Sequence, residues 1–171
     1  MELIIYKHMA KLSHINRENL PEMVGVSDKS ITLRRARAQA QLRVTDEIMA
    51  QIEGSEMRSK KGPVFQTAVL AGVMAAKRTH ELVPLCHPVP LEDCKIEVNV
   101  GKENRVVIEC KVQATHKTGV EMEALTGASV AALTVYDMCK SLSHEIVIES
   151  VRLMEKTGGK RDFNVEDVAK S

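Results

Sequence analysis

Two long stretches of this chain contain no charged side chain, and they limit the folds that the rest of the chain can adopt. Residues 62–76 and 124–136 contain no Asp, Glu, Lys or Arg. Both are rich in alanine and predict helices, over about 63–80 and 122–142. A helix on the surface of one domain needs only an apolar stripe, so helices that are neutral all round need cover on more than one side. We therefore expect a homo-oligomer whose subunits bury the remainder.

Segments with a period of two predict strands around these helices. Polar and apolar residues alternate strictly from Arg35 to Val44. Ala, Arg and Gln are good helix formers, but we take the period as the stronger signal and predict a strand. Residues 95–100 and 106–112 alternate on either side of a turn at 101–104, which predicts a hairpin, and a last strand is expected over 146–153.

The order of these elements is β-α-β-β-α-β. It predicts an α+β fold of the ferredoxin-like type, with one antiparallel sheet and both helices packed on one face. A chain of 171 residues suits a single domain. We also expect a short helix from Thr45 to Gly54 and an exposed basic loop over 55–62. Residues 1–12 are expected to form an N-terminal extension and residues 162–171 a mobile tail.

Composition argues against several classes of partner. Lysine plus arginine (24) nearly balances aspartate plus glutamate (23), so no net basic field attracts nucleic acid or an anionic membrane. Aromatic residues make up 2% of the chain, too few for a base-stacking surface. No segment approaches the roughly 20 apolar residues of a membrane span. Four cysteines without a CxxC pair indicate free thiols, which makes the cytoplasm the expected location.

The end of the second neutral segment contains the most informative polar pair. Asp137 and Lys140 lie three positions apart and therefore on one face of a helix. A salt bridge at a helix C-terminus, where the helix dipole favours lysine, would be an ordinary explanation. The face that leads to this pair is apolar, however, and we expect it to bury both groups. Burial would couple the two pKa values, which suits proton transfer.

Two further groups of polar residues are candidates for chemistry. Glu121 and Glu123 lie where the helix dipole favours carboxylates, and they could also act as bases or accept hydrogen bonds from a guanine-like edge. Cys86 and His87 occupy a proline-rich loop, as an ordinary thiol and loop histidine or as part of a binding segment. Their spacing to Cys94 does not match a usual zinc site, so no metal is expected.

Basic residues gather at three loops or element ends. Such groups are usually solvated, but beside glycine-containing turns they also suit a polyphosphate. The chain has neither a Walker A sequence nor a GxGxxG motif, so side chains would have to hold the phosphates. The groups are Lys60–Lys61, Lys77–Arg78 and Lys156 with Lys160.

Together these segments resemble the MoaC-type cyclic pyranopterin monophosphate synthases of molybdenum cofactor biosynthesis. The likeness extends in order over about residues 14–162, and the run from Lys117 to Lys140 is highly specific. The matching runs are Lys61–Gly62, Ala75–Thr79, Leu82–Pro88, Lys117–Thr126, Ala128–Thr134, Tyr136–Lys140 and Lys156–Lys160.

The resemblance implies a lyase-type rearrangement. A cyclised dihydro-GTP, made by a radical S-adenosylmethionine enzyme, would become cyclic pyranopterin monophosphate with loss of pyrophosphate. The family forms homo-oligomers, typically hexamers built as trimers of dimers, with sites between subunits. We expect no cofactor. A non-catalytic nucleotide-binding regulatory module of the same fold is the alternative, and a thiol hydrolase using Cys86 and His87 is a weaker third reading.

The resemblance also implies roles for individual residues. Asp137 and Lys140 match the family's acid/base pair, and Lys61 matches another active-site lysine. The expected substrate-binding residues are Leu85, Cys86, His87, Glu121, Met122, Glu123 and Lys156, together with Lys77 and Arg78. The chain departs from the family pattern at two places. Gly25 occupies a position where the family usually has aspartate, and the loop before Lys61 is longer, with Lys60 beside Lys61.

The implied reaction moves several protons, and nearby lysines suit that task. We expect Lys61, Lys140 and Lys156 to lie close together and to lower one another's pKa, so that one of them can exchange protons near neutral pH. Asp137 would hold Lys140 in place, and the other cations would stabilise the departing pyrophosphate.

Overall fold

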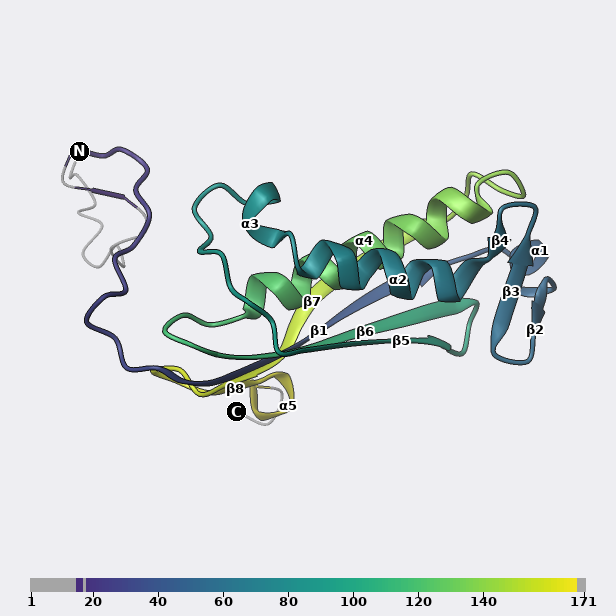
Figure 1. Ribbon diagram of the computed structural model, residues 1–171. Helices are drawn as coiled ribbons and strands as arrows, with labels where there is room; N and C mark the ends of the chain where they lie inside the picture. Colours follow the sequence, from purple (N-terminus) through teal and green to yellow (C-terminus); the bar gives the residue numbers. More distant parts are fainter. Residues whose placement is uncertain (1–14, 17, 169–171) are drawn as a thin grey trace, which may run out of the picture.

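An antiparallel sheet with two long helices along one face forms the body of the molecule (Figure 1). The computed structural model describes residues 15–16 and 18–168. The sheet has the spatial order β5-β6-β1-β7-β8, and its helices are α2 and α4. The bounds of these elements are β1 Thr32–Arg43, α2 Val64–Ala76, β5 Asp93–Val100, β6 Arg105–His116, α4 Glu121–Cys139, β7 Val147–Thr157 and β8 Phe163–Asn164. Without β8, the chain order is β-α-β-β-α-β, so the predicted ferredoxin-like fold is confirmed.

The alternating segment is the central strand β1, as predicted. Its small apolar side chains, from Ala36 to Leu42, are buried against the helices, while its polar side chains lie on the other face of the sheet. The two helices pack unusually close. A Cβ atom on Gly72 of α2 would lie 2.7 Å from the carbonyl oxygen of Gly127 in α4. The small side chains of these helices therefore allow close backbone contact.

The helix over residues 63–80 is shorter than predicted. Helix α2 ends at Ala76, and a separate turn, α3 (Thr79–Leu82), follows it. The Thr79 side chain is buried, and its hydroxyl donates a hydrogen bond to the carbonyl oxygen of Ala76 at 3.0 Å. This side-chain bond satisfies a carbonyl at the helix end and accompanies the break. Strand β7 is longer than predicted, because it ends at Thr157, four residues beyond the expected end at residue 153.

The predictions for residues 45–62 were only partly correct. The short helix begins after Thr45 as expected, but α1 (Asp46–Met49) is a single turn and the Thr45 side chain makes no capping hydrogen bond. The expected loop is a small antiparallel sheet of β2 (Ile52–Glu53), β3 (Glu56–Ser59) and β4 (Gly62–Pro63). Met57 explains the difference, because its side chain is buried in the core and holds β3 against the end of α4.

Part of the segment expected to form a mobile tail has defined structure. Strand β8 pairs with β7, with Lys156 opposite Phe163, and is followed by α5 (Val165–Val168). The predicted extension over residues 1–12 lies outside the described residues. Among the helices that the structure describes, none has the length and apolar character needed to cross a membrane.

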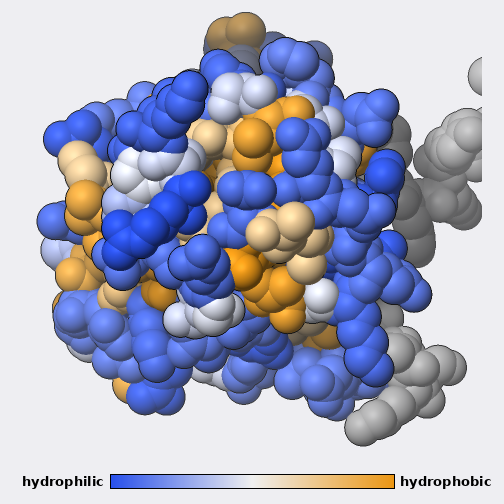
Figure 2. Space-filling model, turned by 90° about the vertical axis from the view of Figure 1, so that its right-hand side faces the viewer, coloured by the Kyte–Doolittle hydropathy of each residue, from blue (hydrophilic) through white to orange (hydrophobic). Residues whose placement is uncertain are grey.

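Several large apolar side chains of the two helices remain exposed on a single chain. Leu70 and Met74 of α2 and Leu133 of α4 are examples, with Leu133 57% exposed. Figure 2 shows a different surface, the end of the molecule near α1 and β3, where apolar patches also lie between hydrophilic side chains. These exposed apolar residues agree with the expectation that other subunits bury part of the surface of the two neutral helices.

Candidate active site

Asp137 accepts hydrogen bonds from two lysines at the end of α4. One carboxylate oxygen lies 2.7 Å from Nζ of Lys140, one helical turn away, and the other lies 2.7 Å from Nζ of Lys61. The expected contact between Asp137 and Lys140 is therefore present. Lys61, and not its neighbour Lys60, joins them, because the turn between β3 and β4 directs Lys61 toward α4. We refer to Lys61, Asp137 and Lys140 as the lysine–aspartate cluster.

This cluster differs from the expectation in two respects, because Asp137 and Lys140 are not buried in a single chain and the pKa of Lys140 shifts in the opposite direction. Hydrogen bonds from Lys140 and Lys61 lower the pKa of Asp137 to about 2. The same contact with Asp137 raises the pKa of Lys140, whereas a lowered lysine pKa was predicted. The physical reason is exposure. The Asp137 and Lys140 side chains are 52% and 48% exposed in a single chain, so ion pairing outweighs desolvation.

A cavity of about 800 Å³ lies at the opposite end of the molecule. Three predicted binding residues line it, namely His87, Glu121 and Lys156. Nζ of Lys156 lies 2.9 Å from a carboxylate oxygen of Glu121. The glycine-containing loop that follows Lys156 forms another wall, as do residues of the N-terminal segment. We call this site the cationic cavity.

The charge of the cationic cavity suits a phosphorylated ligand. Arg34, Lys117 and Lys160 line it together with Lys156, and the acidic residues among its lining are Asp28 and Glu121. Side-chain cations of this kind can hold phosphate oxygens without a glycine-rich phosphate loop. No three His, Cys, Asp or Glu side chains lie close enough to hold a metal ion within residues 15–16 and 18–168.

Four further predicted binding residues, Leu85, Cys86, Met122 and Glu123, are sequence neighbours of lining residues but are not in the lining themselves. Glu123 is 4% exposed, and burial, reinforced by the charge of Glu121, raises its pKa to about 7. Burial also raises the pKa of Cys86, and the nearby charge of Glu123 adds to that shift. Leu85 is half-buried next to Cys86, whereas Met122 is exposed. Because its pKa is about 7, the Glu123 carboxyl can exchange a proton near neutral pH.

Lys77 and Arg78 lie apart from both sites. They follow the last residue of α2, and both side chains are exposed. The structure thus places this basic pair neither in the lysine–aspartate cluster nor among the residues that line the cationic cavity.

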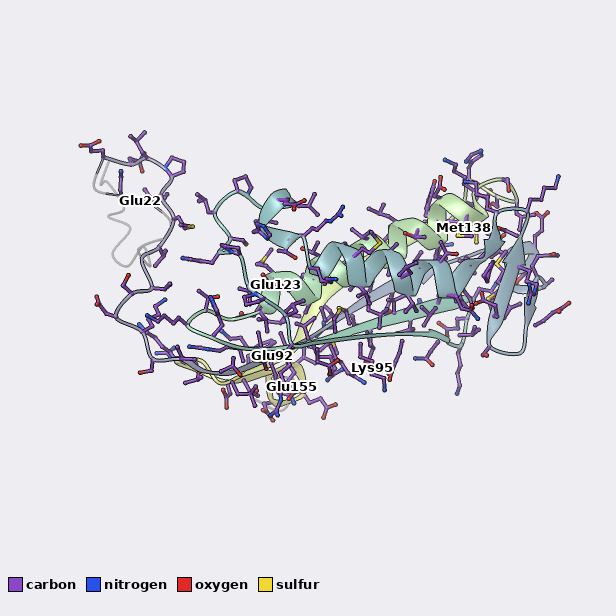
Figure 3. The ribbon with its side chains drawn as sticks, viewed as in Figure 1. Glu22, Glu92, Lys95, Glu123, Met138 and Glu155 are labelled. Atoms are coloured by element: carbon purple, nitrogen blue, oxygen red, sulfur yellow. The ribbon has the colours of Figure 1, made fainter. Side chains whose placement is uncertain are left out.

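The cluster and the cavity lie at opposite ends of α4. Figure 3 labels Glu123 at one end of this helix and Met138, the neighbour of Asp137, at the other. Glu121 and Asp137 are 16 positions apart, which corresponds to about 24 Å along a helix axis. The expectation that Lys156 lies near Lys61 and Lys140 was therefore wrong within one chain, because Lys156 pairs with Glu121 instead.

Comparisons with known proteins agree with this arrangement of motifs. The family model described as the MoaC family matches residues 23–159. The chain belongs to the MoaC family. The predicted resemblance is thereby confirmed, and the match covers both the lysine–aspartate cluster and most of the cationic cavity.

Individual members of the MoaC family are similar over almost the whole chain. A protein of Xanthomonas oryzae pv. oryzae named cyclic pyranopterin monophosphate synthase is 54% identical over 154 residues, which cover 90% of this chain and 93% of that protein. A protein of the same name from Xanthomonas axonopodis pv. citri is 52% identical over the same length. A molybdenum cofactor biosynthesis bifunctional protein of Synechocystis is 47% identical over 156 residues, covering 89% of this chain and 45% of that protein.

Several residues that line the cavity of this MoaC family member were not predicted as site residues, and Arg34 and Lys117 are the two whose hydrogen bonds shape its wall. Arg34 donates hydrogen bonds to the carbonyl oxygens of His116 at 3.1 Å and Lys117 at 3.2 Å. Nζ of Lys117 in turn donates to the carbonyl oxygen of Ser27 at 2.7 Å. Arg34 was hidden because it lies in β1 just before the strictly alternating segment and looks like one more solvent-facing arginine. Lys117 was part of a quoted motif, which could have identified it.

Gly25 adjoins the cationic cavity. Its neighbours Val24 and Val26 line the cationic cavity, and a Cβ atom on Gly25 would have no heavy atom within 4 Å. The residue that departs from the usual MoaC pattern therefore lies at the wall of the cavity, where space is open.

Proposed function

We propose that this chain rearranges a cyclised dihydro-GTP to cyclic pyranopterin monophosphate, with release of pyrophosphate, at a site shared by two protomers. The chain is a lyase with cyclic pyranopterin monophosphate synthase activity in molybdenum cofactor biosynthesis, as its motifs predicted. One observation supports the shared site most directly. The lysine–aspartate cluster and the cationic cavity lie at opposite ends of α4, too far apart to act on the same atoms of one small substrate.

A second copy of the chain can bring the two parts together. Its lysine–aspartate cluster would close over the cationic cavity of the first copy, and the reverse contact would form a second equivalent site. The exposed Leu70, Met74 and Leu133 provide apolar surface for such an assembly. We propose a hexamer arranged as a trimer of dimers, which is the typical state implied by the family resemblance.

The two parts would divide the chemistry. Lys156, Lys117 and Arg34 would bind the phosphates and stabilise the charge that develops on the departing pyrophosphate. Asp137 would orient Lys61 and Lys140 toward the reacting ring. Contact with a second protomer would bury this cluster and favour the neutral form of a lysine, which is the form that accepts a proton.

A mixed oligomer provides the sharpest test of the shared site. Lys140→Ala removes one part and Lys156→Ala the other, and we expect each variant alone to lose most of its turnover. Co-assembly of the two inactive chains should restore part of the activity, because some sites then combine an intact cluster with an intact cavity. Absence of any recovery in verified mixed oligomers would mean that each chain works alone.

The non-catalytic alternative makes a different prediction. A regulatory nucleotide-binding module would need the cationic cavity but not the lysine–aspartate cluster. The protein can be mixed with GTP, S-adenosylmethionine, a reductant and a radical S-adenosylmethionine enzyme, and the product detected as a fluorescent oxidised pterin. We expect product with the wild-type chain and about a hundredfold less with Asp137→Asn. Nucleotide binding without any product would favour the module.

The cellular context of the reaction is also part of the proposal. The substrate would come from a radical S-adenosylmethionine enzyme, because a cyclised dihydro-GTP is the expected product of such chemistry. All four cysteines are unpaired in the structure, in keeping with the proposed cytoplasmic location.

A further inference from the structure

Helix α2 begins without a side-chain cap of its own. Pro63 occupies the N-cap position and offers no side-chain oxygen. The first amide groups of a helix have no partner within the helix and need one from elsewhere. Glu56 of β3 supplies it. One of its carboxylate oxygens accepts a hydrogen bond from the amide of Phe65 at 2.8 Å, and the other accepts from the amide of Gln66 at 3.1 Å.

The strand that carries Glu56 leads directly into the turn that carries Lys61. Strand β3 pairs with β4, with Ser59 opposite Gly62. Within that turn the Ser59 hydroxyl accepts a hydrogen bond from the amide of Lys61 at 3.1 Å. The backbone of Lys61 therefore follows any movement of β3.

The neighbour of Glu56 anchors the other side of the same strand. Met57 is 1% exposed, and its sulfur lies 3.5 Å from Sγ of Cys139, which directly precedes Lys140. Successive side chains of a strand point to opposite faces. Glu56 thus fixes β3 to the start of α2, and Met57 fixes it to the end of α4.

The ion pair alone is a weak means of placing Lys61. Its side chain is 56% exposed, and that of Asp137 is 52% exposed. Exposed ion pairs contribute little to the free energy of folding, because the entropy lost in ordering a long side chain offsets the attraction between the charges. The position of Nζ of Lys61 must therefore depend on how firmly its backbone is held.

We propose that Glu56 is a positioning residue for Lys61. Its carboxylate holds the β3–β4 hairpin on the N-terminus of α2 and so keeps Nζ of Lys61 beside Asp137. The role of this contact in turnover rests on the proposed function, since it assumes that Lys61 and Asp137 take part in the reaction. The placement of Lys61 itself does not depend on that assumption.

Glu56→Gln tests the inference with little change in side-chain volume. Glutamine has one carbonyl oxygen, so it can no longer offer a carboxylate oxygen to each of the two helix amides. Glu53→Gln is the matched control, because Glu53 lies exposed on β2, opposite Glu56 in the strand pairing, and no hydrogen bond or ion pair of its side chain occurs among the described residues. The pKa of the Asp137 carboxyl is measured by carbon NMR, and kcat and KM are measured in the turnover assay.

A positioning role predicts changes that a helix cap alone would not cause. The pKa of Asp137 should rise in Glu56→Gln, as we also expect when Lys61→Ala removes the ammonium that lowers it. We expect kcat to fall about tenfold with KM within about twofold, since small misplacements of a reacting group are costly. In a Lys61→Ala background, Glu56→Gln should cause no further loss of kcat. Glu53→Gln should leave the pKa and both kinetic constants unchanged.

The outcomes separate this inference from the proposed function. If Glu56→Gln lowers the melting temperature by about 2–4 °C, the loss expected for a cap, and leaves the Asp137 pKa and kcat as in the wild type, Glu56 is only a cap and the inference is overturned. If Lys61→Ala turns over normally, the proposed role of Lys61 is wrong. In that case the Asp137 pKa, compared by NMR between Glu56→Gln and the wild type, still decides whether Glu56 positions the Lys61 ammonium.

Discussion

Nζ of Lys61 lies 2.7 Å from a carboxylate oxygen of Asp137, although the two residues are 76 positions apart in the chain. The same ammonium lies 3.4 Å from the backbone carbonyl oxygen of Asp137, close to the end of α4. Lys140 approaches the other carboxylate oxygen from within the helix. A single carboxylate therefore aligns two ammonium groups, one local and one distant in sequence.

The two adjacent lysines should differ sharply in their effect on turnover. Lys61→Ala removes a partner of Asp137, and we expect turnover to fall by about a hundredfold, the scale of a lost acid/base group. Lys60→Ala is the control, because no hydrogen bond or ion pair of the Lys60 side chain occurs among the described residues, and its effect should be mild. Circular dichroism verifies that both variants fold. Equal defects in the two variants would contradict the assignment of Lys61.

Glu123 should make stability depend on pH. Burial raises its pKa to about 7 from a usual value of 4.5, so the folded state favours the protonated carboxyl. Its contribution to stability is full below about pH 4.5 and is lost as the pH rises through about 7. A shift of this size corresponds to a loss on the order of 3 kcal/mol.

Glu123→Gln tests this dependence, because an amide does not titrate in that range. The free energy of unfolding, measured with urea between pH 4.5 and pH 8, should fall less steeply with pH than in the wild type. Glu53→Gln should retain the wild-type slope. A slope that is unchanged in Glu123→Gln would show that another group titrates.

The close contact of α2 and α4 predicts a strong effect of one methyl group. In Gly72→Ala the new Cβ would lie 2.7 Å from a backbone oxygen of α4, so the helices must separate. We expect a loss of about 1–3 kcal/mol in the free energy of unfolding. Gly25→Ala is the matched control, since nothing lies within 4 Å of its Cβ position. Equal stability of the two variants would mean that the helices adjust freely.

The exposed apolar surface of the helices predicts how the protein assembles. Leu133→Glu places a charge where apolar cover is proposed, and we expect smaller species in sedimentation together with lost turnover. Val100→Glu, at the end of β5, changes an exposed apolar residue of the sheet and should preserve both properties. A wild-type chain that sediments as a monomer at micromolar concentration would refute the shared site.

Local patterns were sufficient for most of the secondary structure. The period of two in β1, the neutral segments of α2 and α4, and the hairpin of β5 and β6 all appear as predicted, because each depends on side chains that are near neighbours in the chain. Residues 55–62 were misjudged for the opposite reason. Burial of Met57 against Cys139, 82 positions away, holds this polar segment in a small sheet.

The sequence by itself determined the fold class, the family and the contact between Asp137 and Lys140, which lie within one helical turn. Only the tertiary structure decided that Lys61, and not Lys60, joins this pair, and that Lys156 pairs with Glu121 at the other end of α4. The physical reason is that distances within a helix follow from spacing along the chain. The contacts of loops and strands instead depend on how the core packs.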